Sequence, residues 1–572
     1  MKLPMRFPAI GLAALALILF SSGCSNLHWA SELVPPQGAD LVVVNANVLT
    51  VDDRFPKAQA FAVRAGKISA VGDTASIRLH VGPATKIIDA GGRTIAPGFA
   101  DGHLHNAGGG PGVDLSRVRT MDELLARVAD RVKASKPGDI VVSNSDWHEA
   151  QLKEQRLPLR RDIDRVAPDN PVVLVRGGNQ FIVNSAALAR WKIGKDTAVP
   201  AGGAMPRYAD GELNGELVNN ARQLVQLPSP AALKREDLAA MTRKLHRVGL
   251  TSIRIGGNPN PTTEWGHWKE LKQRGELEMR VNFLFRIYDY SDPAKVRALV
   301  ESWKVGPDEG DEWLRVGGIK TQADGGFEGG WMREPYLEPY GRGGTYRGIN
   351  VVPQRLYLPV ISEVNRMGWR VTTHVVGDAA IDMVLDSYEK VNAEKSIADR
   401  RWMLEHAFIA RPEHFPRMKA LGLMLSVQNH LYLAGPSLVK YWGPVRAART
   451  TPVRDFLDQG FIVAGGTDSP VIPYPPLWVF YHFVTRSTIA AGQLGPEQRV
   501  SRIEALRLIT IGNARFTGEE KIKGSIEPGK VADFVVLSED PMTAPENRIE
   551  GIEVLLTAIG GKTVYVKDGL RF

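Results

Sequence analysis

The sequence predicts an α/β fold organised around a (β/α)8 TIM barrel. Eight apolar runs that end in polar residues follow one another: TIAPGFADGHLH, TSIRIGG, MRVNFLFR, LRVGGIKT, WRVTTHVV, RWMLEHAFI, LGLMLSVQN and FIVAGGTDS. Such runs are typical of strands buried on both faces, and most are separated by enough chain for a helix. Side chains able to bind metal fall at or near the C-terminal ends of strands 1, 4, 5, 6 and 8, where such barrels place their functional sites. They are His103, Lys320, His374, His406 and Asp468.

The first 39 residues are not expected to belong to this fold. Lys2 and Arg6 precede the apolar run AIGLAALALILF, which is too short to span a bilayer but suits a signal peptide. The run ends in SSGC, and Cys24 is the only cysteine of the chain. This pattern resembles a bacterial lipoprotein signal over 1–23, with Cys24 as the lipidation site and 24–39 as a linker. A plain signal peptide is the alternative.

A lipoprotein signal and a plain signal peptide both predict an exported protein. The lipoprotein signal further predicts a lipid-anchored periplasmic protein of the bacterial cell envelope. Removing 1–23 takes away two cations and no acids, so the net charge falls from +8 to +6. The basic residues form scattered pairs and no stripe, which argues against a nucleic-acid partner. The expected partners are a small-molecule substrate and, through the lipid anchor, a membrane; the sequence leaves a homodimer open.

Short strands are expected on both sides of the barrel. Residues 40–95 contain alternating runs, and Ala65-Gly66 between two of them indicates a hairpin. Residues 513–572 show the same pattern in GSIEPGKVADFVVLS and TAIGGKTVYVKDG. We therefore expect the two termini to form one small composite β-sandwich around a barrel that spans 96–512.

The first barrel connection is much longer than the others. Roughly 140 residues separate predicted strands 1 and 2, far more than a βα connection needs. They include DELLARVADRVKA with helical spacing and the strand-like NPVVLVRGGNQ. We expect a small α/β insertion, about 107–245, over the mouth of the barrel. A second long loop, from Asp324 to Gly348, is rich in glycine and aromatic residues and includes Trp331. This loop is interpreted either as a flap that closes on substrate or as an ordered surface loop.

The metal-binding side chains form one set in this fold. His103 and His105 share a face of their strand, so both reach one ion. Histidine nitrogen and carboxylate oxygen suit zinc, and an open coordination position is typical of catalysis. The set predicts a metal-dependent hydrolase.

Several stretches extend this prediction to a family. APGFADGHLH, GGIKTQADGG, THVVGDAAI, LEHAFI, GGTDSP and the tail GSIEPGKVADFVVL make the chain resemble the amidohydrolase superfamily of metal-dependent hydrolases. It resembles in particular amidohydrolase family 3, the group that includes N-substituted formamide deformylases. The resemblance covers residues 40–572, and it implies the same barrel and composite sandwich.

The resemblance also implies roles for the metal-binding set. Lys320, carboxylated on its amine, would bridge two divalent ions. If Lys320 stays unmodified, we expect one ion, with Asp324 and Glu328 as the nearest alternative anions. Asp468 would contact a metal ion and move the proton of the attacking water. The ions would be held by two histidine pairs: His103 with His105, and His374 with His406.

Two stretches depart from the family pattern. VRGGNQFIVNSAAL has Asn179 where the family carries a histidine, and TSIRIGG has Arg254 in the stretch that often reads Thr-Ser-Val-His-Asp. Both departures put the identity of the substrate in doubt. Candidate substrate-binding residues are Asn179, Arg254, Trp331, Gln428 and His430. The histidines expected to be structural are His148, His246, His267, His414 and His482.

The leading functional prediction is hydrolysis of a non-peptide C–N bond in a small amide through a metal-activated water. An ester, lactone or phosphoester hydrolase would use the same site. A lipoprotein that binds a small molecule without converting it is the third alternative, and a binder has no need of Asp468.

Overall fold

The computed structural model describes residues 38–572, apart from 109, 178–179, 201–202, 228–231, 257–259 and 339. The predictions for the signal segment 1–23, for Cys24 and for Asn179 fall outside the described residues. Within those residues, no helix has the length and apolar character needed to cross a membrane.

The centre of the molecule is an eight-stranded parallel barrel, as the sequence predicted. Its strands pair in chain order. Backbone hydrogen bonds between the segments at the ends of the first and last strands close the barrel: Asp468 N donates to His103 O at 2.7 Å, and His105 N donates to Ser469 O at 2.9 Å. The strands are β8 (Phe99–Leu104), β14 (Leu250–Gly256), β15 (Arg280–Arg286), β16 (Leu314–Gln322), β17 (Val371–Val375), β18 (Met403–His406), β19 (Met424–Gln428) and β20 (Val463–Gly466).

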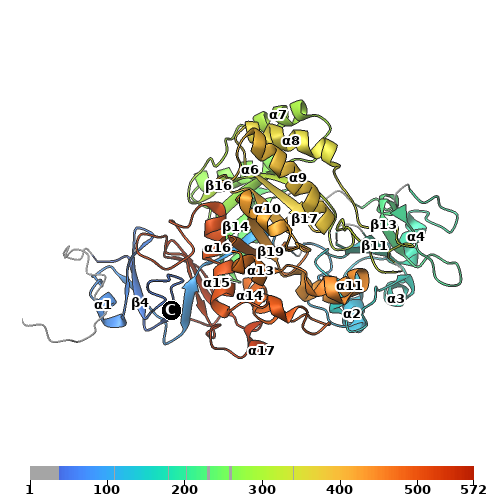
Figure 1. Cartoon of the computed structure of the whole chain (residues 1–572). Helices are drawn as coiled ribbons and strands as arrows, with labels where there is room; N and C mark the ends of the chain where they lie inside the picture. Colours follow the sequence, from blue (N-terminus) through green and yellow to red (C-terminus); the bar gives the residue numbers. More distant parts are fainter. Residues whose placement is uncertain are drawn as a thin grey trace, which may run out of the picture.

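Helices cover the outside of the barrel (Figure 1). Strand β15 illustrates how aromatic residues cover its outward face. Phe283 lies 5.5 Å from Trp265 of α6 between ring centroids, and Phe285 stacks on Trp303, which caps α7, at 4.6 Å. The covering helices include α5 (Arg235–His246), α6 (Pro261–Gln273), α7 (Pro293–Ser302), α8 (Gln354–Arg366), α9 (Asp378–Glu394), α10 (His414–Ala420), α14 (Pro476–Thr485), α15 (Arg502–Leu508) and α16 (Ile511–Thr517).

The apolar run TIAPGFADGHLH, predicted as one strand, forms two strands that belong to different domains. Residues Thr94–Pro97 form β7 of the sandwich, and Phe99–Leu104 form β8 of the barrel. Gly98 lies between them, and a Cβ at this position would fall 2.3 Å from Oγ1 of Thr251. A single apolar run therefore crosses the domain boundary, and only a residue without a side chain fits at the crossing.

Both termini build the predicted composite sandwich. One sheet has the order β5-β4-β1-β6 and the other β23-β22-β21-β7-β2-β3. Strand β21 (Phe534–Leu537) pairs antiparallel with β7, which joins the C-terminal segment to the N-terminal one. Phe61 and Phe534 meet in the core with ring centroids 5.1 Å apart. The remaining strands are β1 (Leu41–Val44), β2 (Asn47–Leu49), β3 (Lys57–Ala58), β4 (Ala60–Arg64), β5 (Lys67–Gly72), β6 (Lys86–Asp89), β22 (Val554–Ile559) and β23 (Lys562–Val566).

The long first connection forms the α/β insertion. Its sheet has the order β12-β13-β11-β10-β9. Figure 1 shows the insertion and the sandwich at opposite ends of the barrel. Helix α5, within the predicted insertion range, packs instead on barrel strand β14. The insertion contains α2 (Met121–Lys133), β9 (Val141–Val142), η1 (Glu149–Gln151), α3 (Arg160–Asp164), β10 (Val172–Arg176), β11 (Gln180–Val183), α4 (Ser185–Arg190), β12 (Gly203–Ala204) and β13 (Glu216–Asn219).

Candidate metal centre

The predicted metal-binding residues converge at the C-terminal end of the barrel. Asp468, directly after β20, places Oδ1 3.1 Å from Nε2 of His103 and 3.0 Å from Nε2 of His105. The ring of His406 lies 4.9 Å from that of His103 and 4.5 Å from that of His374, between centroids. Barrel closure thus brings residues from β8, β17, β18 and the end of β20 into one cluster.

Backbone and amide oxygens fix the orientation of three of these imidazoles. Nδ1 of His105 lies 2.6 Å from the carbonyl oxygen of Gly256, and Nε2 of His374 lies 3.1 Å from that of Gly325. Nδ1 of His406 lies 2.7 Å from Oε1 of Gln428. Each oxygen can only accept, so the facing nitrogen carries the proton and the other nitrogen keeps a lone pair. Metal-binding histidines are typically oriented in this way.

The donor set fits a divalent metal ion. His103, His105 and Asp468 each offer a ligand atom, and these atoms lie within 4.8 Å of one another. Nε2 of His406 is buried without a hydrogen-bond partner among the described residues. Buried polar atoms are usually satisfied, so this atom points to a ligand. Imidazole nitrogens with a carboxylate are the donors that zinc prefers.

The electrostatics of the cluster favour the protonation states that a metal needs. Burial lowers the pKa of His103 to about 4 and that of His374 to about 3, so both rings are neutral near pH 7. Burial would raise the pKa of Asp468, but the facing imidazoles, with His103 first, hold it well below its usual value. The site therefore offers neutral imidazoles and an ionised carboxylate.

Lys320 lies at the centre of the barrel in β16 and is 3% exposed. Burial, followed by the nearby charge of Arg286, lowers its pKa well below the usual lysine value. Its Nζ contacts the carboxylate of Glu405. A neutral amine is the form that reacts to give a carbamate, so this environment is compatible with the carboxylated lysine that the resemblance implies.

Glu405 is a buried member of the site that sequence reasoning missed. It has no exposed surface, its Oε2 lies 3.0 Å from Nδ1 of His103, and its Oε1 accepts from Nη1 of Arg254 at 2.7 Å. Neighbouring strand residues normally point to opposite faces. His406 has a φ of +71°, so the chain leaves strand geometry there and both side chains reach the cluster.

The structure corrects the predicted role of Arg254. Its guanidinium lies inside the barrel, paired with Glu405 and 5.1 Å from the ring centroid of Phe516. It is 2% exposed and does not line the large cavity above the cluster. Arg254 therefore balances the charge of a buried glutamate and is not placed to contact a substrate in that cavity.

Of the three other predicted substrate-binding residues that the structure describes, one lines the cavity and two do not. His430 lines the cavity, and its Nε2 lies 3.1 Å from Oδ2 of Asp468. Gln428 is fully buried against His406, and Trp331 packs against the barrel core, so neither lines the cavity. Asp324, an alternative metal ligand, instead accepts from the backbone of Trp331, Val376 and Gly377 at 2.8–2.9 Å.

Above the metal-binding cluster lies a cavity of about 1040 Å³. The barrel, the insertion and the loop between β16 and α8 all contribute to its wall. Its volume is large for one small substrate, and its wall has a strong aromatic component. The aromatic residues of the wall are Trp147, Phe327, Tyr336, Tyr340, Tyr346, Phe408 and Tyr441.

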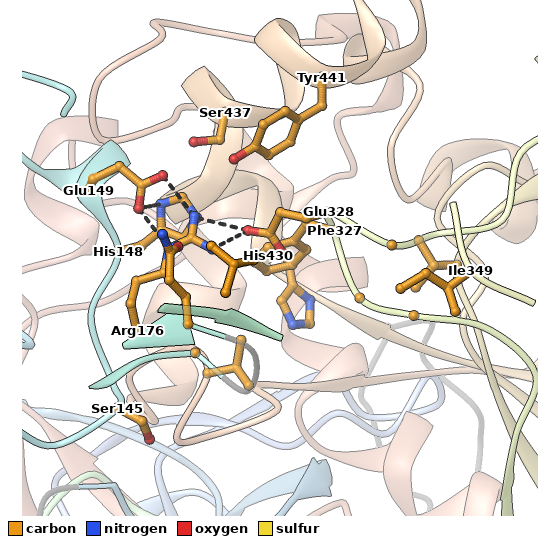
Figure 2. A pocket seen from close by; sticks show the side chains of 18 of the residues that line it. Ser145, His148, Glu149, Arg176, Phe327, Glu328, Ile349, His430, Ser437 and Tyr441 are labelled. Atoms are coloured by element: carbon orange, nitrogen blue, oxygen red, sulfur yellow. Dashed lines mark hydrogen bonds and ion pairs between the residues drawn. The ribbon is translucent and has the colours of Figure 1, made fainter. Parts of the chain in front are cut away.

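A buried ion cluster joins the insertion to this loop (Figure 2). Arg176 of β10 donates to both carboxylate oxygens of Glu149 at 2.8 and 2.7 Å, and it also donates to Glu328 of the loop. Nε2 of His148 lies 2.7 Å from Nη2 of Arg176. The sequence placed His148 among structural histidines and Glu328 among alternative metal ligands, but both line the cavity within this cluster. Only the fold of the insertion reveals that position.

Fold and site together define a metal-dependent hydrolase built on a TIM barrel. The chain belongs to the amidohydrolase family, which it matches over residues 86–565. The family and the fold class predicted from the sequence are therefore confirmed, and with them an amidohydrolase that acts on C–N bonds other than peptide bonds.

Relatives match nearly the full length. An N-substituted formamide deformylase of Arthrobacter pascens is 31% identical, covering 93% of this chain and 99% of the relative. The protein LONG AFTER FAR-RED 3 of Arabidopsis thaliana is 30% identical, covering 98% and 99%. Among solved structures, an uncharacterized metal-dependent hydrolase from Pyrococcus horikoshii OT3 aligns with a TM-score of 0.63. It is 21% identical, covering 89% of this chain and 99% of that one, which supports the fold.

Proposed function

We propose that this protein hydrolyses the amide bond of small N-acyl compounds, with N-substituted formamides as the first class to test. The observation that carries the proposal is the position of Asp468. Its carboxylate faces three imidazoles, those of His103, His105 and His430, at 3.0–3.1 Å, at the floor of a cavity large enough for a substrate. The name of the Arthrobacter relative supports the choice of formamides.

We propose that the cofactor is zinc, bound as two ions. His103 and His105 would hold one ion, His374 and His406 the other, and a carboxylated Lys320 would bridge them. When bound, such ions lower the pKa of water and polarise a carbonyl group. The pairing of Glu405 with Arg254 supports the bridge, because Arg254 balances the negative charge of the Glu405 carboxylate, which lies beside Lys320.

Asp468 is proposed as the proton carrier. Its carboxylate is ionised, so it accepts the proton of the attacking water and then delivers it to the leaving nitrogen. The water oxygen joins the acyl carbon as the C–N bond breaks, and the products are a carboxylic acid and an amine. His430, through its contact with Oδ2, holds the carboxylate so that Oδ1 faces the cluster.

The Asp468→Asn variant tests this proposal. Asn is nearly isosteric, so the fold and most of the metal should be retained, while turnover of an N-substituted formamide should fall about 10²–10⁴-fold. Asp114→Asn is the matched control, because Asp114 is an exposed carboxylate of the insertion. Full activity of Asp468→Asn at full metal content would refute the role of Asp468. Turnover of esters or lactones without any turnover of amides would refute the assigned bond.

We also propose that the protein is exported and lipid-anchored through Cys24. The basic residues and apolar run of 1–20, followed by SSGC, support this localisation. Full-length protein should fractionate with membranes, and Cys24→Ala should remain as an unprocessed precursor or become soluble. Wild-type protein that is entirely soluble would contradict the anchor.

A further inference from the structure

Arg286 is a cation of the cavity wall that the hydrolytic mechanism does not use. It is the last residue of β15 and pairs in register with Lys320 on the neighbouring strand β16. Phe283 and Phe285 of the same strand pack outward against tryptophans of the helical layer. Alternation along the strand therefore turns Arg286 toward the barrel mouth, and it lines the cavity together with the metal-binding residues.

The guanidinium of Arg286 is held in place before any substrate arrives. Its Nη2 donates to Oε1 of Gln322, and Nε2 of Gln322 donates to the carbonyl oxygen of Asp324 at 2.9 Å, which fixes the amide. The Cζ atom lies 4.6 Å from the ring centroid of Tyr288. A side chain oriented in this way loses little further entropy when it binds a ligand.

Among the described residues, no carboxylate lies within ion-pair distance of Arg286, and its Nε is buried without a hydrogen-bond partner. Arg176 in the same cavity is different, because it pairs with both Glu149 and Glu328. Partly buried cations are stable when paired. The protein leaves one cation beside the reaction centre for an anion that comes from outside the chain.

We propose that Arg286 binds an anionic group of the substrate, in particular a carboxylate located close to the scissile amide. Guanidinium groups bind carboxylates through paired, charge-assisted hydrogen bonds. Because Arg286 lies beside Lys320, the carboxylate must be only a few bonds from the acyl carbon. The substrate class is therefore N-acyl α-amino acids and related amido acids. This inference rests on the proposed amide hydrolysis and narrows its substrate.

Two probes that differ by one carboxylate test the inference: N-formylphenylalanine, as both enantiomers, and N-formylphenethylamine. Wild-type protein should prefer the better enantiomer of the acid. In Arg286→Met, the ratio of kcat/KM for the acid to that for the neutral amide should fall about 10- to 100-fold, mainly through KM, the range of a hydrogen bond to a charged group. Arg347→Met is the matched control, because Arg347 is an exposed cation of the loop between β16 and α8 that does not line the cavity, and it should leave this ratio unchanged.

The outcomes separate the alternatives. An unchanged ratio in Arg286→Met overturns the inference. An equal loss for both probes together with a loss of metal also overturns it, because Arg286 would then support a carboxylated Lys320. If wild-type protein hydrolyses neither amide, the proposed function fails. The inference is then judged by calorimetric titration of metal-loaded protein with N-formylphenylalanine: an affinity that drops in Arg286→Met supports it, and an equal affinity overturns it.

Discussion

Replacing Gln428 by leucine tests how the protein orients a metal-binding histidine. Gln428 Oε1 accepts from Nδ1 of His406 at 2.7 Å, and Gln428 Nε2 donates to Oγ of Ser426 at 2.8 Å, which sets the orientation of the amide. Gln428 is fully buried. Leucine has a similar volume but no acceptor, so the substitution removes one interaction and leaves the shape of the core.

The size of the effect follows from the group left unpaired. A buried N–H without an acceptor costs about 1–3 kcal/mol. At about 1.4 kcal/mol per tenfold change, the metal affinity should fall roughly 5- to 150-fold. Losses of roughly 10- to 100-fold are typical for residues that support a metal ligand. The expected result for Gln428→Leu is therefore a metal affinity roughly 10- to 100-fold weaker, with activity restored by excess zinc.

Competition with a coloured chelator measures this affinity directly. Gln428→Glu is the matched control, because it keeps an oxygen acceptor for Nδ1 of His406 and should retain most of the affinity. Wild-type affinity in Gln428→Leu would refute the reasoning. A higher KM with unchanged metal binding would instead restore the prediction, made from the sequence, that Gln428 contacts the substrate.

Three further predictions concern the rest of the molecule. Arg280→Met breaks a buried bidentate pair with Asp533, with N–O distances of 2.6 and 2.9 Å, at the end of the barrel far from the site. We expect the free energy of unfolding, measured with denaturant, to fall by about 3–5 kcal/mol while kcat is unchanged. A lower kcat in fully folded protein would contradict this prediction. The pKa of Glu149 and of Glu328 is held low because Arg176 outweighs the effect of burial. Their stabilising contribution is thus complete above the ordinary glutamate value of 4.5 and is lost as the pH falls through the lowered values; urea midpoints should decrease on acidification, and less steeply in Arg176→Met. Removing metal with a chelator should abolish activity and lower the melting temperature, and zinc should restore both; activity that survives complete removal would refute the metal-dependent mechanism.

The barrel was predictable because its strands are buried on both faces. Continuous apolar runs such as MRVNFLFR need no knowledge of distant contacts to be recognised. The boundary between β7 and β8 was not predictable by this rule. TIAPGFADGHLH is one apolar run, but its halves belong to two domains, and the crossing at Gly98 depends on its contact with Thr251. A pattern along the chain reports burial and does not report which core buries the residue.

The convergence of the candidate metal-binding residues was predictable for a related reason. His103, Lys320, His374, His406 and Asp468 each lie at a strand end, and the parallel barrel gathers such ends at one face. Glu405 was missed because strand alternation would turn it away from His406, and the positive φ of His406 is not visible in the sequence. Local periodicity fails where the backbone leaves the regular strand.

Arg286 and Arg176 show most clearly what sequence reasoning lacks. Both lie at the ends of strands that point into the same cavity. The strand-end rule that selected Lys320 applies equally to Arg286, but it cannot separate a cation used for structure from one used for binding. The difference is set by partners distant in the chain: Arg176 meets Glu328, 152 positions away, and Arg286 meets no described carboxylate. Recognition of the substrate therefore depends on the charge left unbalanced after folding, and this quantity exists only in the folded protein.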